Sequence, residues 1–99
     1  MASGWVGILT CELHFPEARS LKDKRQQLRS AKAQLQHRVG ASVAEVDHHE
    51  LWQRARITAA CVARQQREAE RLLDEAERWL RAQAWEVARA ERLLVDPED

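Results

Sequence analysis

Residues 5–16 read WVGILTCELHFP and contain the clearest strand signal of the chain. From residue 9 to residue 15, apolar side chains alternate with polar ones. This period of two predicts a strand over residues 5–15 with one buried face. Pro16 ends the strand, because proline has no backbone N–H to donate to a β-ladder.

A helix is predicted directly after this strand, over residues 21–38. Ser20 is a favourable N-cap residue, and Asp23 places a negative charge at the positive end of the helix dipole. Gly40 ends the helix, since glycine readily adopts the left-handed conformation of a C-cap. Four apolar residues share one face of this helix: Leu21, Leu28, Ala31 and Leu35.

Two extended segments follow, over residues 41–47 and 51–63, and the polar residues between them predict a β-hairpin. In the second segment the odd positions are apolar apart from Gln53. The even positions begin with Trp52, Arg54, Arg56 and Thr58. We therefore expect one dry sheet face and an opposite face that is basic, with an aromatic side chain at its end.

The first of these two segments does not fit a regular strand. Val43 and Val46 point to opposite faces when side chains alternate with a period of two. A β-bulge, which inserts one extra residue into a strand, would resolve this conflict.

A second helix is predicted over residues 66–83. Its apolar stripe has the clearest helical spacing in the chain: Ala69, Leu72, Leu73, Ala76, Trp79 and Leu80. The next segment, residues 84–95, has two interpretations. Helix-forming residues without Gly or Pro favour continuing the helix to Leu94. A turn followed by an edge strand through Trp85 and Val87 would instead complete a fourth position in the sheet.

Strand, helix, strand, strand, helix and a last strand is the ferredoxin-like order. The predicted fold class is therefore α+β: a ferredoxin-like βαββαβ sandwich with an antiparallel four-stranded sheet and two helices on one face. Residues 1–99 are expected to form a single domain, because 99 residues leave little room for a second core. Residues 96–99 are expected to be a disordered tail.

Four sequence blocks between residues 9 and 80 stand in a characteristic order and spacing: Leu9-Thr10 with Glu12-Leu13 and Pro16, SLKDKR at 20–25, SVAEVD at 42–47 and LWQRA at 51–55. In these blocks the chain resembles the YlxP-like family of small uncharacterised bacterial proteins. The resemblance implies a ferredoxin-like sandwich in which the segment after the second helix is a strand. It also implies a bacterial cytosolic protein of unestablished biochemical function, often encoded beside translation-initiation and ribosome-maturation genes. It supplies no catalytic or binding residues.

The chain is neutral overall, with 16 Lys and Arg against 16 Asp and Glu, but the two signs are segregated along it. Residues 19–38 contain seven bases and one acid, whereas residues 68–99 contain ten acids and five bases. We therefore expect a molecule with one basic and one acidic side. No run of about 18 apolar residues and no signal peptide occurs, so we expect a cytoplasmic protein without a membrane partner.

The basic side of the first helix is the candidate binding surface. Four cationic residues fall within a sector of about 80° on this helix: Lys22, Arg25, Arg29 and Lys32. Such a row suits phosphate oxygens. Together with the gene context that the resemblance implies, it predicts an RNA or a ribosomal particle as partner, with Arg54 and Arg56 as further contacts. Alternatively, these side chains only solvate the helix and cover its apolar flank.

The sheet face without helices supports a different class of function. Ile8 and Trp52, together with Val6 and Val46, would form an apolar band among charged side chains. Because Trp and Arg are enriched at interfaces, this band predicts a homodimer or an adaptor module. Trp52 could instead cover the edge of its own core.

No pattern in the sequence predicts catalysis, and we expect a binding protein rather than an enzyme. Cys11 and Cys61 lie in apolar runs, so both are expected in the core. His48 and His49 are adjacent and would point to opposite sides of a strand, which argues against a metal site. Without a phosphate-binding loop or a nucleophile motif, we expect no cofactor and no small-molecule substrate.

Overall fold

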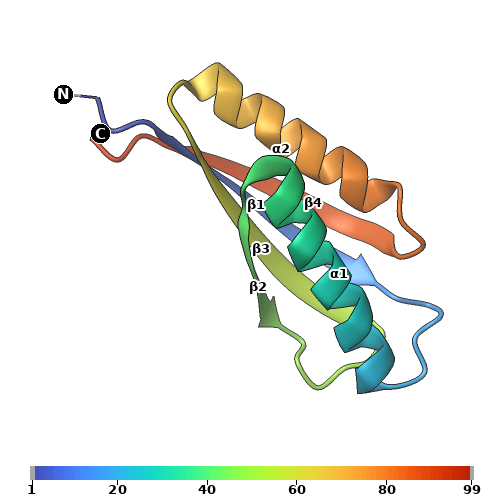
Figure 1. Ribbon diagram of the computed structural model, residues 1–99. Coiled ribbons are helices and arrows are strands. Elements are labelled where there is room, and N and C mark those ends of the chain that lie inside the picture. Colours follow the sequence, from blue (N-terminus) through green and yellow to red (C-terminus); the bar gives the residue numbers. More distant parts are fainter. Residues whose placement is uncertain (1, 99) are drawn as a thin grey trace.

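The computed structural model describes residues 2–98 (Figure 1). Its elements follow in the order β1 (Trp5–His14), α1 (Leu21–Val39), β2 (Ser42–Asp47), β3 (Arg54–Ala63), α2 (Gln66–Arg81) and β4 (Glu86–Val95). The strands form one antiparallel sheet with the spatial order β2-β3-β1-β4. The predicted element order is therefore confirmed.

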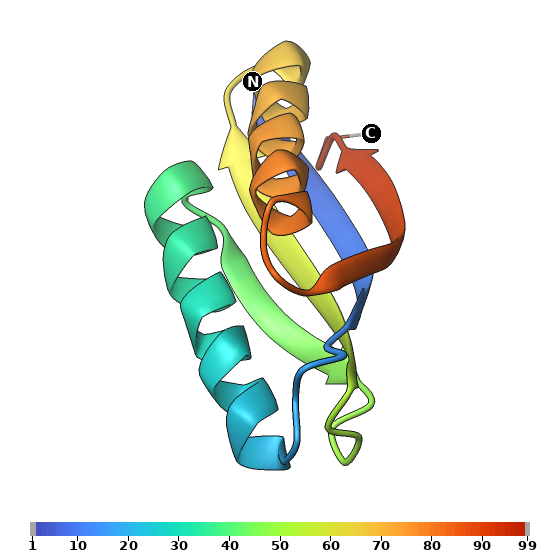
Figure 2. The ribbon, with the colours of Figure 1, turned by 90° about the vertical axis from the view of Figure 1, so that its right-hand side faces the viewer.

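Both helices cover the same face of the sheet, as Figures 1 and 2 show from two sides. α1 contacts β2, and α2 contacts β1, β3 and β4. No element of residues 2–98 covers the other face, which we call the open face. This arrangement is the predicted α+β ferredoxin-like sandwich.

The core lies between the sheet and the helices, and the alternation in β1 predicts it correctly. Leu9, Cys11 and Leu13 are buried, and Cys61 of β3 is buried as well. Gly7 continues this face toward α2. A Cβ atom at this position would lie 3.1 Å from the Cγ atom of Leu73, so the absence of a side chain lets α2 pack closely on β1.

Both predicted ends of α1 are confirmed by hydrogen bonds. The Oγ atom of Ser20 accepts a hydrogen bond from the backbone N–H of Asp23 at 3.1 Å. Gly40 adopts the left-handed conformation, with φ of 66°, and its N–H donates to the carbonyl oxygen of Gln36. The helix extends one residue beyond the predicted end, to Val39.

Residues 86–95 form a strand, so the extension of the second helix to Leu94 that local propensity favours is wrong. α2 ends at Arg81, two residues before the predicted end. Trp85 is buried between Phe15 and Trp79, with ring centroids 5.7 and 5.8 Å apart in edge-to-face geometry. This aromatic cluster stabilises the turn, and pairing with β1 stabilises the strand, which together outweigh the helix propensity.

Both strands of the hairpin begin later than predicted, β2 by one residue at Ser42 and β3 by three residues. β3 begins at Arg54, not at residue 51, because residues 48–53 form a loop. β2 contains an irregularity between Glu45 and Asp47, the place where a bulge was expected. It does not bring the two valines to one face: Val43 pairs with Ala59 on the helix side, while Val46 has no partner in the register and is exposed.

The first and the last described segments of the chain lie close together (Figure 1). The Oγ atom of Ser3 donates a hydrogen bond of 2.7 Å to Glu98. The backbone N–H of Glu98 donates to Asp96. Of the expected tail over residues 96–99, residue 99 lies outside the described residues. Within residues 2–98, no helix is long and apolar enough to span a membrane.

Candidate functional site

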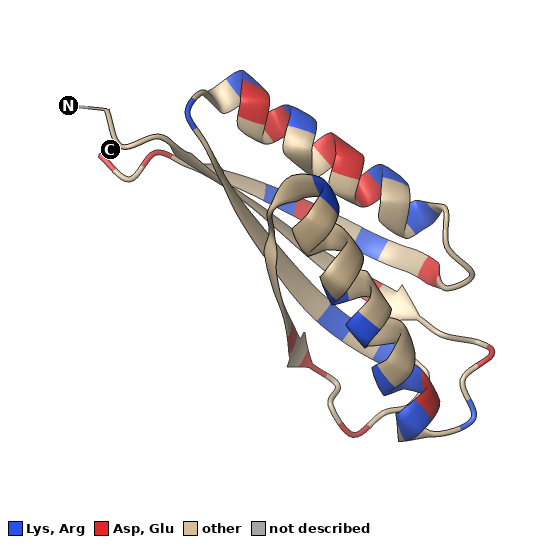
Figure 3. Cartoon of the chain, in the orientation of Figure 1, with Lys and Arg blue, Asp and Glu red and all other residues tan. Residues whose placement is uncertain are grey.

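The cations of α1 gather on its N-terminal half, where Figure 3 shows Lys and Arg together with one acidic segment. Lys22, Arg25, Arg29 and Lys32 are all exposed. In the described part of the chain, no carboxylate oxygen lies within 4.0 Å of their charged groups. We call these four residues the α1 basic edge. The structure therefore keeps the predicted row together and leaves its charges available.

The opposite flank of α1 contacts the second helix. The guanidinium of Arg38 lies 3.5 Å from the carboxylate of Glu75 and 5.9 Å from the centre of the Trp79 ring. At 100° per residue, Arg38 is roughly 120° to 180° away from the members of the α1 basic edge. The basic edge therefore lies on the side of α1 that faces away from α2.

Lys24 lies on the buried face of the same helix, and its side chain has no solvent exposure. Its Nζ atom donates to the carboxylate of Glu45 at 2.8 Å and to the carbonyl oxygens of His48 at 2.9 Å and Arg54 at 3.2 Å. A longer contact of 3.4 Å reaches the carbonyl oxygen of His49. Lys24 thus ties the loop between β2 and β3 to the start of α1.

Lys24 is one of the seven bases counted over residues 19–38, and its burial was not predicted. A signal for its burial was present, because Lys24 precedes Leu28 by four residues and falls on the apolar face. A lysine at such a position needs an acidic partner. Glu45 is that partner, but only the strand pairing brings it near.

Several cations in the C-terminal half have acidic partners, in contrast to the α1 basic edge, although Arg64, Arg67 and Arg71 contact no carboxylate among the described residues. Arg92 of β4 lies 2.7 Å from Asp74 and 3.1 Å from Glu77, and Arg81 lies 2.8 Å from Glu77. These hydrogen bonds, first from Arg81 and then from Arg92, lower the pKa of Glu77 below its ordinary value. The acids of α2 therefore neutralise neighbouring arginines, and α2 carries both signs in alternation (Figure 3).

The charged end of the open face is not the basic surface that the sequence predicted. Arg56 is hydrogen bonded to Glu12 and lies 3.4 Å from Asp47, and Arg54 lies 4.0 Å from Glu12. The hydrogen bond to Glu12 raises the pKa of Arg56. Neither acid is near these arginines in sequence, and cross-strand pairing brings both to them. Arg54 and Arg56 therefore belong to a mixed-charge cluster.

The other end of the open face is apolar. Ile8 pairs with Ala60 on one side and Leu93 on the other, and Val6 pairs with Val62. Val62 is 71% exposed and Leu93 is 57% exposed. We call Val6, Ile8, Val62 and Leu93 the apolar end.

The predicted band that joins Ile8 and Trp52 does not exist. Ile8 pairs with Ala60, whereas Trp52 precedes Arg54, which pairs with His14 at the opposite end of β1. Six residues of a strand separate the two positions, or about 20 Å. The expectation is wrong because Trp52 lies in the loop before β3, outside the strand alternation.

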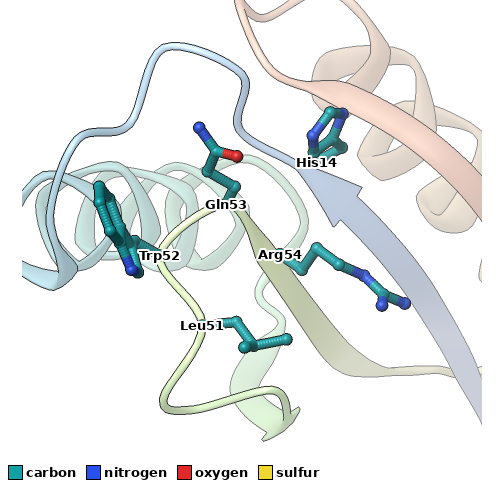
Figure 4. Close-up of a pocket in the computed structure, with 5 residues that line it drawn as sticks. All are labelled: His14, Leu51, Trp52, Gln53 and Arg54. Atoms are coloured by element: carbon teal, nitrogen blue, oxygen red, sulfur yellow. The ribbon is translucent and has the colours of Figure 1, made fainter.

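Trp52 instead lines an open depression beside the start of β3, with a volume of about 340 Å³. Figure 4 shows this depression with its other lining residues, His14, Leu51, Gln53 and Arg54. Trp52 is 49% exposed, so it does not cover the edge of the core as the alternative interpretation expected.

The buried thiols have no features of reactive groups. Burial, with a smaller contribution from Glu77, raises the pKa of Cys11 to about 12. Burial also raises the pKa of Cys61. Across residues 2–98, no group of three or more His, Cys, Asp or Glu side chains is placed to hold a metal ion.

Comparison with known families identifies the chain at the level of the family. A family model described as a protein of unknown function (DUF503) matches residues 6–92. The chain belongs to the DUF503 family. The blocks that resemble the YlxP-like family over residues 9–80 lie inside the matched DUF503 region. The comparison with curated proteins found no relative.

Among solved structures, the chain is similar to the de novo designed protein Ferredog-Diesel. The two share 14% sequence identity with a TM-score of 0.43. The similarity covers 96% of this chain and 88% of the designed one.

Proposed function

We propose that this DUF503 protein binds RNA, free or within a ribosomal particle, through the α1 basic edge and without catalysing a reaction. The observation that carries the proposal is that four exposed cations without ion pairs share one edge of a single helix. Arg56, Arg81 and Arg92 contact carboxylates, whereas Lys22, Arg25, Arg29 and Lys32 contact none among the described residues. Exposed cations without partners are the groups that phosphate oxygens can pair with at the lowest desolvation cost.

The length of the edge fits a nucleic-acid backbone. Lys22 and Lys32 are separated by ten residues, or about 15 Å along the helix axis. A row of this length can contact several successive phosphates. The edge contains no aromatic residue and no amide side chain among its four members, so it would bind the backbone with little preference for sequence.

The family context agrees with this proposal. We propose the YlxP-like label for the chain on the four sequence blocks. The gene neighbourhood of that family, beside translation-initiation and ribosome-maturation genes, favours RNA or a ribosomal particle over other polyanions. The same context supports a location in the bacterial cytoplasm.

The test is fluorescence anisotropy with a labelled single-stranded RNA and two double variants. Arg25→Glu/Arg29→Glu should weaken binding by about tenfold to a hundredfold. Arg67→Glu/Arg71→Glu is the matched control, since both arginines are exposed, lie four residues apart on α2 and have no ion pair within residues 2–98. Equal losses in both variants would show that only net charge matters and would reject the α1 basic edge.

A second candidate function is a homodimer, favoured by the exposure of Val62 and Leu93 in the apolar end. A two-fold axis through this end would place an uncharged patch against its own copy. The charged end of each open face would stay at the rim. Sedimentation at rising protein concentration should detect a dimer that Leu93→Lys disrupts and Val46→Lys, at an exposed position of β2, does not. A monomer at every concentration would reject this candidate.

A further inference from the structure

The loop between β2 and β3 holds an exposed tryptophan in a fixed place. Trp52 is half exposed, and Leu51 beside it is 44% exposed. Large aromatic side chains are mostly buried in folded proteins, so this exposure needs a physical explanation. The polar residues around the depression in Figure 4 suggest a ligand rather than missing core packing.

Hydrogen bonds hold the loop in one conformation. The backbone N–H of Phe15 donates to the carbonyl oxygen of Gln53 at 2.8 Å, and the Nε2 atom of Gln53 donates to Ala18 at 3.3 Å. On the buried face of α1, the Nζ atom of Lys24 donates hydrogen bonds to the carbonyl oxygens of His48 and Arg54. Trp52 is therefore presented by a pinned backbone, which lowers the entropy that a ligand must remove on binding.

The groups around the depression match the chemistry of a nucleobase. Leu51 and Trp52 provide apolar surface, and a base stacks favourably on an indole. The Oε1 atom of Gln53 makes no hydrogen bond to the described residues and can accept from the edge of a base. The guanidinium of Arg54 is more than half exposed, and its nearest acid, Glu12, lies 4.0 Å away, at the outer limit of an ion pair. The guanidinium can therefore reach a phosphate.

We propose that this depression binds one unpaired base of the RNA strand whose phosphates contact the α1 basic edge. The inference rests on the proposed function. Lys24 connects the two surfaces, because it belongs to α1 between Lys22 and Arg25 and its Nζ atom bonds to the loop that carries Trp52. A single-stranded segment can therefore contact both surfaces, with Trp52 stacking on a base and the helix neutralising the backbone.

The charges near the depression set the orientation of the strand. His14 lies 3.2 Å from Glu86, so a carboxylate borders that side. A phosphate there would be repelled, whereas a phosphate toward Arg54 or the start of α1 would be attracted. The base would then lie over Leu51 and Trp52, with its phosphate directed away from Glu86.

The experiment compares two probes of equal length and charge: a single-stranded oligouridine and the same ribose-phosphate chain without bases. The wild-type protein should bind oligouridine about fivefold or more tightly than the abasic chain, since stacking of one base contributes about 1–3 kcal/mol. Trp52→Ala should bind both probes equally, at the affinity of the wild type for the abasic chain. Trp52→Phe should keep most of the preference, because phenylalanine retains a stacking surface.

The outcomes separate this inference from the proposed function. Arg25→Glu/Arg29→Glu should lose affinity for both probes by the same factor. Equal wild-type affinity for both probes would overturn the base site and leave backbone binding intact. A preference that survives in Trp52→Ala would also overturn it, because the preference would then arise at another surface. Absence of binding to either probe would reject the proposed function itself.

Discussion

Lys24 and Arg25 are neighbours in sequence, but the fold uses their charges differently. Lys24 is completely buried and bonds to Glu45 and to backbone carbonyl groups. Arg25 is exposed and contacts no carboxylate among residues 2–98. The helix therefore has one cation that holds the structure together and a row of cations that the structure does not need. The second kind is available for a partner.

The largest effect is expected at the buried pair. Glu45→Ala should lower the free energy of unfolding by about 3–5 kcal/mol, because it leaves the charge of Lys24 buried without its partner. Urea denaturation followed by circular dichroism measures this change. Replacing both residues, as Lys24→Met/Glu45→Leu, should restore much of the stability. A loss below about 1 kcal/mol in Glu45→Ala would mean that Lys24 is not a structural cation.

A smaller effect should distinguish exposed cations that have ion pairs from those that do not. Arg29→Gln should weaken RNA binding by about threefold to tenfold, since it removes one available phosphate contact. Arg56→Gln should change the affinity by less than about twofold, because Glu12 and Asp47 already neutralise this guanidinium. Anisotropy titrations at fixed salt measure both. If the Arg56 variant loses as much affinity as the Arg29 variant, ion pairing does not decide which cations bind RNA.

The ion pairs between α2 and β4 should make the free energy of unfolding depend on pH in the acid range. Because Arg81 and Arg92 lower the pKa of Glu77, its contribution to stability is complete above the ordinary value of 4.5 and is lost as the pH falls through the lowered pKa. Glu77→Gln should therefore cost about 0.5–1 kcal/mol at pH 7 and nothing near pH 2. Glu70→Gln, at an exposed position on the same helix without an ion pair in the described chain, is the control and should cost nothing at either pH. A constant difference across this pH range for Glu77→Gln would contradict the pairing.

The smallest effect is expected for stability at the α1 basic edge. Arg25→Gln should change the free energy of unfolding by less than about 0.5 kcal/mol, as exposed substitutions without partners usually do. Thermal denaturation beside Glu45→Ala measures the contrast directly. A loss comparable with that of Glu45→Ala would show that the exposed row is structural as well.

Local patterns predicted most of the fold because they involve neighbours in sequence. The alternation in residues 5–15, the cap at Ser20 and the stop at Gly40 depend on a few adjacent residues, and all three are confirmed. The last strand depends on distant packing, because Trp85 lies between Phe15 and Trp79. Local propensity could not reveal that contact, and only the element order and the family resemblance pointed to a strand.

In the candidate site, too, the features that depend on neighbours in sequence could be predicted, and those that depend on distant contacts could not. The row from Lys22 to Lys32 was predictable, since helical periodicity alone places its members on one edge. The neutralisation of Arg56 by Glu12 was not, because the two residues meet only through the register of β1 and β3. The burial of Lys24 had a local signal, but its partner Glu45 also comes from another element.

The most direct test of the central claim is the salt dependence of binding to single-stranded RNA. If the four cations of the α1 basic edge neutralise about four phosphates, the logarithm of the affinity should fall against the logarithm of salt concentration with a slope near −3. Arg25→Glu/Arg29→Glu should flatten this slope, and Arg67→Glu/Arg71→Glu should leave it unchanged. A wild-type slope near zero, or an equal slope in all three proteins, would contradict the account.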